Sequence, residues 1–255
     1  MGHLDHAAFG WLTPVLSYVM ACIGAALGLR CTVRALGASG RSRRNWLITA
    51  ASAIGTGIWT MHFVAMLGFA VTGTDIRYNV LLTILSLLVA MVFVGAGVFA
   101  VGYGKDRTRS LLLGGLATGF GVAGMHYLGM AALRLHGQVH YDPVLVALSV
   151  VIAVVAATAA LWAGLNIKSP IAVAVASLVM GAAVSSMHYT GMISVSVDVA
   201  PSGSELSGAT AMQFIFPLAV GLGSYLFITA AFVALSPTAR ERAEYASAEQ
   251  LVPTS

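Results

Sequence analysis

Three stretches of this sequence decide its fold: "GTGIWTMHFVAM" (55–66), "GFGVAGMHYLGM" (119–130) and "GAAVSSMHYTGM" (181–192). All three fit one pattern, G-x-[GA]-[IV]-x-x-M-H-[FY]-x-[AG]-M. Their histidines, His62, His126 and His188, are separated by 64 and 62 residues. Such long agreement at a nearly constant spacing indicates an internal repeat. We therefore expect a two-helix unit that occurs three times in parallel, followed by one further helix.

The composition is that of a membrane protein. The chain has 255 residues, of which 58% are hydrophobic and only 9% are charged, and its mean hydropathy is +0.89. Soluble domains carry about 25% charged residues, so we expect an integral protein whose main partner is the lipid bilayer. The isoelectric point of about 9.3 does not indicate nucleic-acid binding, because the basic residues cluster in short segments between apolar runs, as membrane topology requires.

Seven apolar runs are long enough to cross a bilayer, which takes about 20 residues in a helix. They are Trp11–Leu29, Leu47–Phe69, Val80–Val101, Leu111–Leu133, Pro143–Leu165, Ile171–Val195 and Phe214–Leu235. We expect helices, because a membrane barrel would need strict alternation over strands of about ten residues. The predicted fold is therefore all-α, a bundle of seven transmembrane helices. Pro217 lies inside the last run and is expected to kink it.

The lysines and arginines between the runs predict the orientation of the chain. One side would carry Arg30, Arg34, Arg41, Arg43, Arg44, Lys105, Arg107, Arg109, Lys168, Arg240 and Arg242. The other side would carry only Arg77 and Arg134. Because short basic loops stay in the cytoplasm, the N-terminus is predicted outside and the C-terminus inside. Residues 1–237 would form the membrane domain, with the first apolar run retained as a helix, and residues 238–255 a short polar cytoplasmic tail.

This orientation places every histidine motif near the outer end of the second, fourth or sixth helix. The histidine and the second methionine of each motif are four residues apart, so they share a helix face with the small residue between them. If the three repeats surround one axis, three imidazoles and up to six thioethers converge. The residues concerned are Met61, His62, Met66, Met125, His126, Met130, Met187, His188 and Met192.

Copper is the metal that such a set of side chains favours. Thioether sulfur is soft and selects Cu(I), and imidazole suits Cu(I) and Cu(II). Magnesium and calcium prefer oxygen ligands, and a structural zinc site would normally include a cysteine cluster. Haem ligation by two histidines is an alternative, although three equivalent histidines do not suggest a pair.

A purely structural role for the motif is a second alternative, with methionine filling space and histidine joining neighbouring helices by hydrogen bonds. Six of the eleven methionines lie in the three motifs, and ionisable residues inside a membrane are usually functional, which favours the metal site. We expect the aromatic residues that follow the histidines to be anchors at the membrane interface. They are Phe63, Tyr127 and Tyr189.

Other polar residues point to no second site. Two exterior groups have weak metal-binding character and are expected to be solvated segments: His3, Asp5 and His6, and His136, His140 and Asp142. Neither Lys105 nor Lys168 lies in an apolar run, which excludes a retinal Schiff base, and no run contains a carboxylate for a proton relay. No catalytic triad, phosphate loop or paired-carboxylate site is present, so we expect no enzyme activity.

The three "MH[FY]xxM" phrases, each near the outer end of every second helix, resemble the MHYT domain, a sensory module of bacterial membranes. The resemblance covers about residues 10–237. It implies seven helices in the bacterial cytoplasmic membrane and copper bound by the motif methionines and histidines at Met61, His62 and Met66 and at their equivalents in the other two repeats. It also implies sensing of a diatomic gas such as O₂, CO or NO. A change of redox state at the copper is the other signal that we expect.

Two departures from the family pattern qualify that expectation. Phe63 replaces the tyrosine of the motif, so a tyrosine ligand common to all repeats is not expected. Many family members continue into cyclic-di-GMP domains, whereas only about twenty residues follow the last run here, so we expect the signal to pass to a partner in the membrane or cytoplasm. Copper uptake, storage or delivery is the alternative function, for which Met20, Met91 and Met180 are candidate inward steps.

Overall fold

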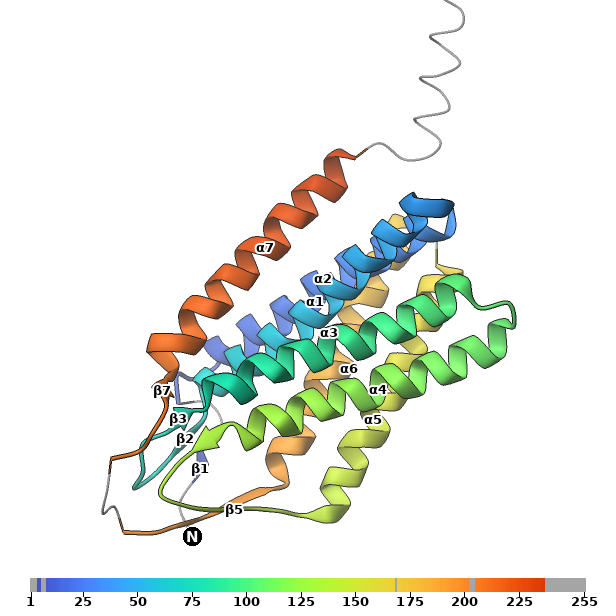
Figure 1. Ribbon diagram of the computed structural model, residues 1–255. Coiled ribbons are helices and arrows are strands. Elements are labelled where there is room, and N and C mark those ends of the chain that lie inside the picture. Colours follow the sequence, from blue (N-terminus) through green and yellow to red (C-terminus); the bar gives the residue numbers. More distant parts are fainter. Residues whose placement is uncertain (1–3, 6–7, 168, 202–204, 237–255) are drawn as a thin grey trace, which may run out of the picture.

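The fold is known from a computed structural model, which describes residues 4–5, 8–167, 169–201 and 205–236. Within these residues, seven helices are long and apolar enough to span a membrane, which confirms the predicted seven-helix bundle (Figure 1). Helices α1 to α6 are Leu12–Leu36, Gly40–Leu67, Val80–Tyr103, Arg107–Ala131, Pro143–Asn166 and Pro170–Ile193. Helix α7, Phe216–Leu235, follows a turn of π-helix at Ala211–Ile215.

The first connection is much shorter than the sequence predicts. Helix α1 continues to Leu36 and α2 begins at Gly40, so the five arginines expected in a loop lie on the two helices. Arginine is a good helix former, and helices of 25 and 28 residues exceed the roughly 20 needed to cross the hydrocarbon, so their ends can extend beyond it. Arg30, Arg41 and Arg44 are exposed there. The orientation in the membrane stays a prediction, and Lys168, Arg240 and Arg242 lie outside the described residues.

Helices α1 to α6 form a closed ring in which each helix packs on the next and α6 packs on α1, while α7 lies outside against α1 and α2. Glycine allows the close approach of α1 to α2 and of α3 to α4. A Cβ atom on Gly57 would lie only 2.7 Å from the Cα atom of Gly24. Small residues drive such contacts in membranes, where lipid removes most of the hydrophobic advantage of helix association.

The first glycine of each motif makes the contact between consecutive repeats. It packs on the odd-numbered helix of the following repeat, where an added Cβ atom would lie 3.0 Å or less from a neighbouring atom. The three contacts are Gly55 with Met91, Gly119 with Val154 and Gly181 with Cys22. Because the third contact returns to α1, the three repeats surround a common axis.

In the described part of the chain, seven short strands cover one end of the ring, which we call the strand end. They are β1 (Leu4–Asp5), β2 (Ala70–Val71), β3 (Arg77–Tyr78), β4 (Leu133–Arg134), β5 (Gly137–Tyr141), β6 (Val195–Val199) and β7 (Ala209–Thr210). They pair antiparallel as β1-β2, β4-β3-β7 and β5-β6. All except β1 lie in the connections that follow α2, α4 and α6, so these connections are joined to one another (Figure 1).

Polar caps and proline mark the helix starts. Asp106 and Asp142 accept hydrogen bonds from backbone N–H groups in the first turns of α4 and α5, and Asn79 does the same for α3. Pro217 is the second residue of α7, a position where its missing N–H costs little. The kink expected at Pro217 stays a prediction, and the irregular part of the last span is the π-helical turn directly before α7.

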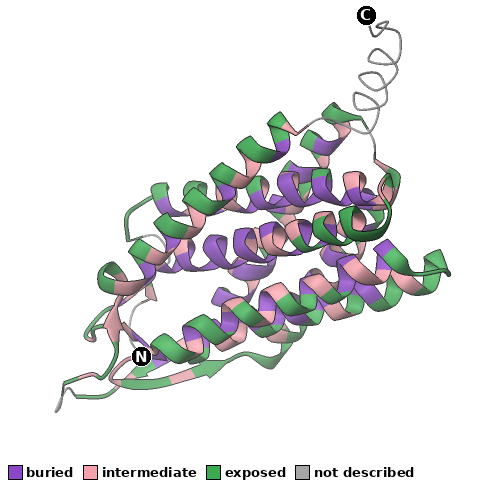
Figure 2. Ribbon diagram, turned by 45° about the horizontal axis from the view of Figure 1, so that its top comes forward, coloured by how far each residue is buried: buried purple, intermediate pink, exposed green. Residues whose placement is uncertain are grey.

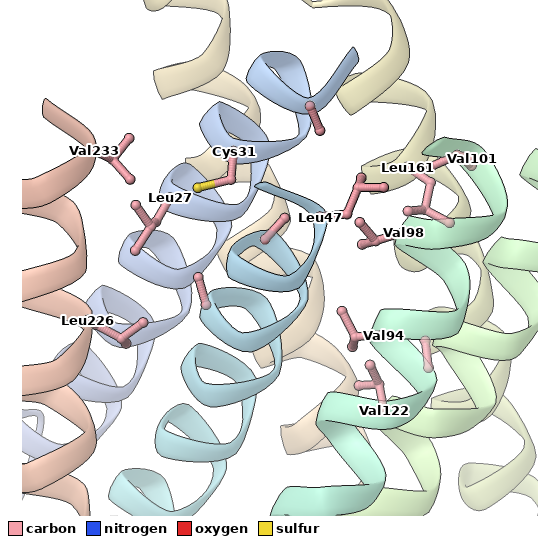
Figure 3. Packing of buried hydrophobic residues seen from close by; sticks show 14 of the residues in the cluster. Leu27, Cys31, Leu47, Val94, Val98, Val101, Val122, Leu161, Leu226 and Val233 are labelled. Atoms are coloured by element: carbon pink, nitrogen blue, oxygen red, sulfur yellow. The ribbon is translucent and has the colours of Figure 1, made fainter. Parts of the chain in front are cut away.

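Burial fits a lipid environment, since many large apolar residues are exposed. The buried residues lie on the parts of the helices that face one another inside the ring (Figure 2). The buried residues form two large clusters along the bundle. One, which includes Leu47, Val94 and Val122, occupies the half away from the strands (Figure 3). The other includes Trp59, Phe63 and strand residues such as Tyr78, and fills the strand end.

Candidate metal centre

The three motif histidines lie at one level of the bundle. Each is five residues before the end of its helix, and His62, His126 and His188 have 0%, 0% and 2% of their surface exposed. Their Nδ1 atoms face one another, at 3.0 Å between His62 and His188, 3.2 Å between His62 and His126 and 3.3 Å between His126 and His188. Among the residues the structure describes, no other group of three His, Cys, Asp or Glu residues comes together in this way.

Protons alone cannot satisfy this triangle of nitrogen atoms. A hydrogen bond along each edge needs one protonated and one unprotonated Nδ1 atom. A triangle cannot alternate the two states, so at least one edge joins two donors or two acceptors. The Nε2 atoms of His62 and His126 are buried and have no hydrogen-bond partner. A cation at the centre would accept all three Nδ1 lone pairs together.

The size of the triangle also fits a metal ion. With edges of 3.0–3.3 Å, its centre lies about 1.8 Å from each nitrogen, close to the roughly 2.0–2.1 Å of a zinc–imidazole bond. No carboxylate belongs to the group, so hard cations such as magnesium lack the oxygen ligands that they require.

The small residue near the end of each motif has a definite role in this packing. A Cβ atom on Gly129 would lie 2.6 Å from Nε2 of His62, and one on Gly191 would lie 2.5 Å from Nε2 of His126. The second and third repeats thus leave room for the histidine of the repeat before them. Ala65 is the equivalent residue of the first repeat, and it is buried too.

The six motif methionines are all buried, with at most 2% of their surface exposed. Four of them, including Met66 and Met192, belong to the apolar cluster at the strand end, which also contains Val71, Val195 and Val197 of the strands. The strands therefore close the histidine group off from that end. Ligation of a metal by the methionine sulfurs stays a prediction.

The aromatic residues after the histidines are not simple interface anchors, contrary to the prediction for Phe63 and Tyr127. Phe63 is fully buried. Tyr127 makes a 2.6 Å hydrogen bond to Ser149 of α5, which joins the second repeat to the third. Trp59, one turn before Phe63, makes the corresponding link, since its indole N–H donates to Ser86 of α3 at 2.9 Å. Sequence patterns miss these links because their partners lie on other repeats.

The exterior polar residues that the structure describes do not form a second metal site. His140 pairs with Asp198 at 3.3 Å, and both side chains are more than half exposed. Asp142 caps α5, and the backbone N–H of His136 donates to Thr74. Asp5 lies in β1, whereas His3 and His6 lie outside the described residues.

The sequence is similar to known signalling proteins. The MHYT family, described as a bacterial signalling protein N-terminal repeat, matches residues 55–115 and 119–177. The bifunctional diguanylate cyclase/cyclic di-GMP phosphodiesterase MucR of Pseudomonas aeruginosa is 40% identical over 194 residues, which cover 73% of this chain and 28% of MucR.

Two further relatives show the same partial coverage. The cyclic di-GMP phosphodiesterase NbdA of Pseudomonas aeruginosa is 35% identical over 80% of this chain and 26% of NbdA. The signaling protein YkoW of Bacillus subtilis is 30% identical over 83% of this chain and 27% of YkoW. The chain thus spans about a quarter of the length of these relatives. No solved structure matches it significantly.

Proposed function

Because this chain belongs to the MHYT family of bacterial signalling proteins, we propose that it is a multi-pass membrane sensor that holds copper at its histidine triad. By the triad we mean His62, His126 and His188. The signal would be a diatomic gas or a change of redox state, and the protein would sit in the bacterial cytoplasmic membrane with the triad near the outer face.

One observation carries this proposal: three buried Nδ1 atoms within 3.3 Å of one another, in an arrangement that protons cannot satisfy. Imidazole suits both oxidation states of copper, and the motif methionines around the triad offer the soft sulfur that Cu(I) prefers. A copper ion would add an open position for a small ligand and a one-electron change of charge.

The side chains around the triad would set the properties of that ion. Gly129 and Gly191 fix where two of the imidazole rings lie. The apolar cluster formed with the strands would exclude water and favour the lower charge of Cu(I). The lack of a carboxylate in the triad acts in the same direction.

The response would leave the chain through another protein or protein segment. The relatives MucR and NbdA are named for making or degrading cyclic di-GMP, and this chain spans about a quarter of their length. We propose that a signalling partner in the membrane or cytoplasm reads the state of the ring, and that the ring itself does no catalysis.

Metal content tests the proposal most directly. The protein would be purified in mild detergent without a histidine tag or chelator, reconstituted with Cu(I), and analysed by mass spectrometry of metals. We expect bound copper that a His62→Ala/His126→Ala/His188→Ala variant loses and a His140→Ala control keeps. Copper in the triple variant, or zinc in place of copper in the wild type, would contradict the proposal.

Copper uptake, storage or delivery is the second candidate function. It is favoured by Met180, which lines an internal cavity on the side of the triad away from the strands. Met91 is a weaker step, because it packs against Gly55. Copper flux into proteoliposomes that the triple histidine variant abolishes would support transport, whereas copper binding without flux would leave sensing as the function.

A further inference from the structure

A cavity of about 60 Å³ lies inside the helix ring. Five helices line it, and six of its twelve lining residues are alanines from α1 and α5. Alanine leaves space that larger apolar residues would fill, so the sequence itself encodes this void.

The cavity lies next to the triad, on the side away from the strands. Ile58, Val122 and Val184 line it, and each precedes a triad histidine by four residues. Residues four apart lie on one face of a helix, separated by about 6 Å along its axis. The three repeats therefore contribute equivalent side chains to the cavity directly beneath the histidine rings.

A second cavity of about 30 Å³ continues the space away from the triad. The two cavities share five lining residues, among them Ala157 and Met180. The second extends towards Leu29 and Gly164, nearer the opposite end of the bundle. The internal space is thus a short row rather than an isolated packing defect.

The lining is apolar and carries no charged side chain. Thr118 is its one polar residue, and the hydroxyl group of Thr118 lies beside Gly97 of α3. Apolar cavities stay dry, and one of about 150 Å³ holds benzene or xenon, while a single water needs only about 10–15 Å³. A volume of about 60 Å³ between these limits suits a molecule of two or three heavy atoms.

We infer that this cavity is a binding site for a small, neutral, nonpolar molecule held against the inner face of the triad. Such molecules gain free energy by leaving water for apolar surroundings, and the bilayer around the ring concentrates them. Methionines and strand residues pack together on the other side of the triad. A small molecule therefore reaches the triad more easily from the cavity side. The inference deepens the proposed function, because it gives the sensed molecule a place beside the metal.

Xenon is the probe for this site, because it is neutral and nonpolar and needs no metal. Binding would be measured by xenon-129 NMR on the full chain in detergent, with and without copper. We expect saturable binding in both forms. Ala157→Val should abolish it by filling the cavity, whereas Ala159→Val, on the lipid-exposed side of α5, should not.

Because the cavity-filling Ala157→Val variant could misfold, the test also includes a variant that enlarges the cavity. Met180→Ala removes a side chain that lines both cavities, so xenon binding should become stronger. Absence of xenon from the wild type, or equal binding in the Ala157→Val and Ala159→Val variants, would overturn the inference. The result is separate from the copper assignment, which fails only if the metal is absent from the triad.

Discussion

The first and second repeats hold their histidines in the same place by different means. In the second repeat, Tyr127 reaches Ser149 of the next repeat. In the first, Phe63 has no hydroxyl group, and Trp59 reaches Ser86 instead. Ser86 follows the histidine of the first repeat by 24 residues and Ser149 follows that of the second by 23, and both are fully buried serines on an odd-numbered helix. The link between repeats is kept although the residue that makes it has moved by one turn.

The same two repeats differ beside the histidine rings. The second leaves space with Gly129 for His62, while the first has Ala65 at the equivalent position. The repeats are not identical, yet the triad that they form is nearly threefold symmetric. Its Nδ1–Nδ1 distances all lie between 3.0 and 3.3 Å. The difference shows which parts of the motif tolerate exchange and which do not.

Single histidine variants should test this near-equivalence with the largest effect. We expect His62→Ala, His126→Ala and His188→Ala each to weaken copper binding by more than about 100-fold, since even supporting residues around a metal cost 10–100-fold. Competition with a Cu(I) chelator would measure the affinity. A variant that keeps wild-type affinity would show that its repeat does not contribute a ligand.

Glycine substitutions should have the next largest effect. In Gly129→Ala and Gly191→Ala, the added Cβ atom would lie 2.6 and 2.5 Å from an Nε2 atom, so a histidine ring must move. We expect copper affinity to fall by roughly 10–100-fold. Ala65→Gly should keep it, and Gly221→Ala, where nothing lies within 4 Å, is the matched control. Unchanged affinity in both glycine variants would refute the role of the small residue.

Exchanging the aromatic groups should change stability rather than metal binding. Tyr127→Phe removes one hydrogen bond and should lower the free energy of unfolding by about 1 kcal/mol. Trp59→Phe should lower it by more, because it also leaves a cavity where the fully buried indole was. Phe63→Tyr adds a hydroxyl group to a fully buried ring whose tip lies beside Gly129, and should cost about 1–3 kcal/mol. Denaturation in detergent would measure these values. A stabilising Phe63→Tyr change would mean that the first repeat can use the tyrosine after all.

The smallest expected effect is on the response to alkaline pH. Tyr78 lies beside Phe63 and Tyr141 beside Tyr127, and burial raises the pKa of both phenols. The unfolded chain loses these protons near pH 10 while the folded chain keeps them, so the free energy of unfolding falls as pH rises beyond about 10. Tyr78→Phe should remove more of this fall than Tyr141→Phe, because Tyr78 is 1% exposed and Tyr141 37%. Equal slopes in unfolding curves from pH 9 to 11 would contradict this.

Much of the fold follows from the sequence, because helices in lipid need long apolar runs and the recurring histidine motif identifies the three repeats. The strands could not be predicted, since most have only two residues, and even β6, whose sequence VSVDV alternates, depends on pairing with β5, which lies far away in the chain. The histidines could be placed at one level, but their meeting depends on closure of the ring. That closure comes from contacts such as Gly181 with Cys22, which no local pattern reveals.

Helix α7 gives this nearly symmetric ring a direction. In a threefold arrangement, a movement at the triad would affect the three repeats equally, and no repeat would be favoured in passing it on. Arg34 of α1 donates a 2.8 Å hydrogen bond to the backbone oxygen of Val233 near the end of α7, and its guanidinium group lies 5.0 Å above the ring of Trp46 in α2. Nearer the middle of the bundle, Ser52 of α2 and Tyr225 of α7 share a 2.6 Å hydrogen bond. Because α7 is bonded to the first repeat at these two places, a shift of the first repeat would move α7 with it.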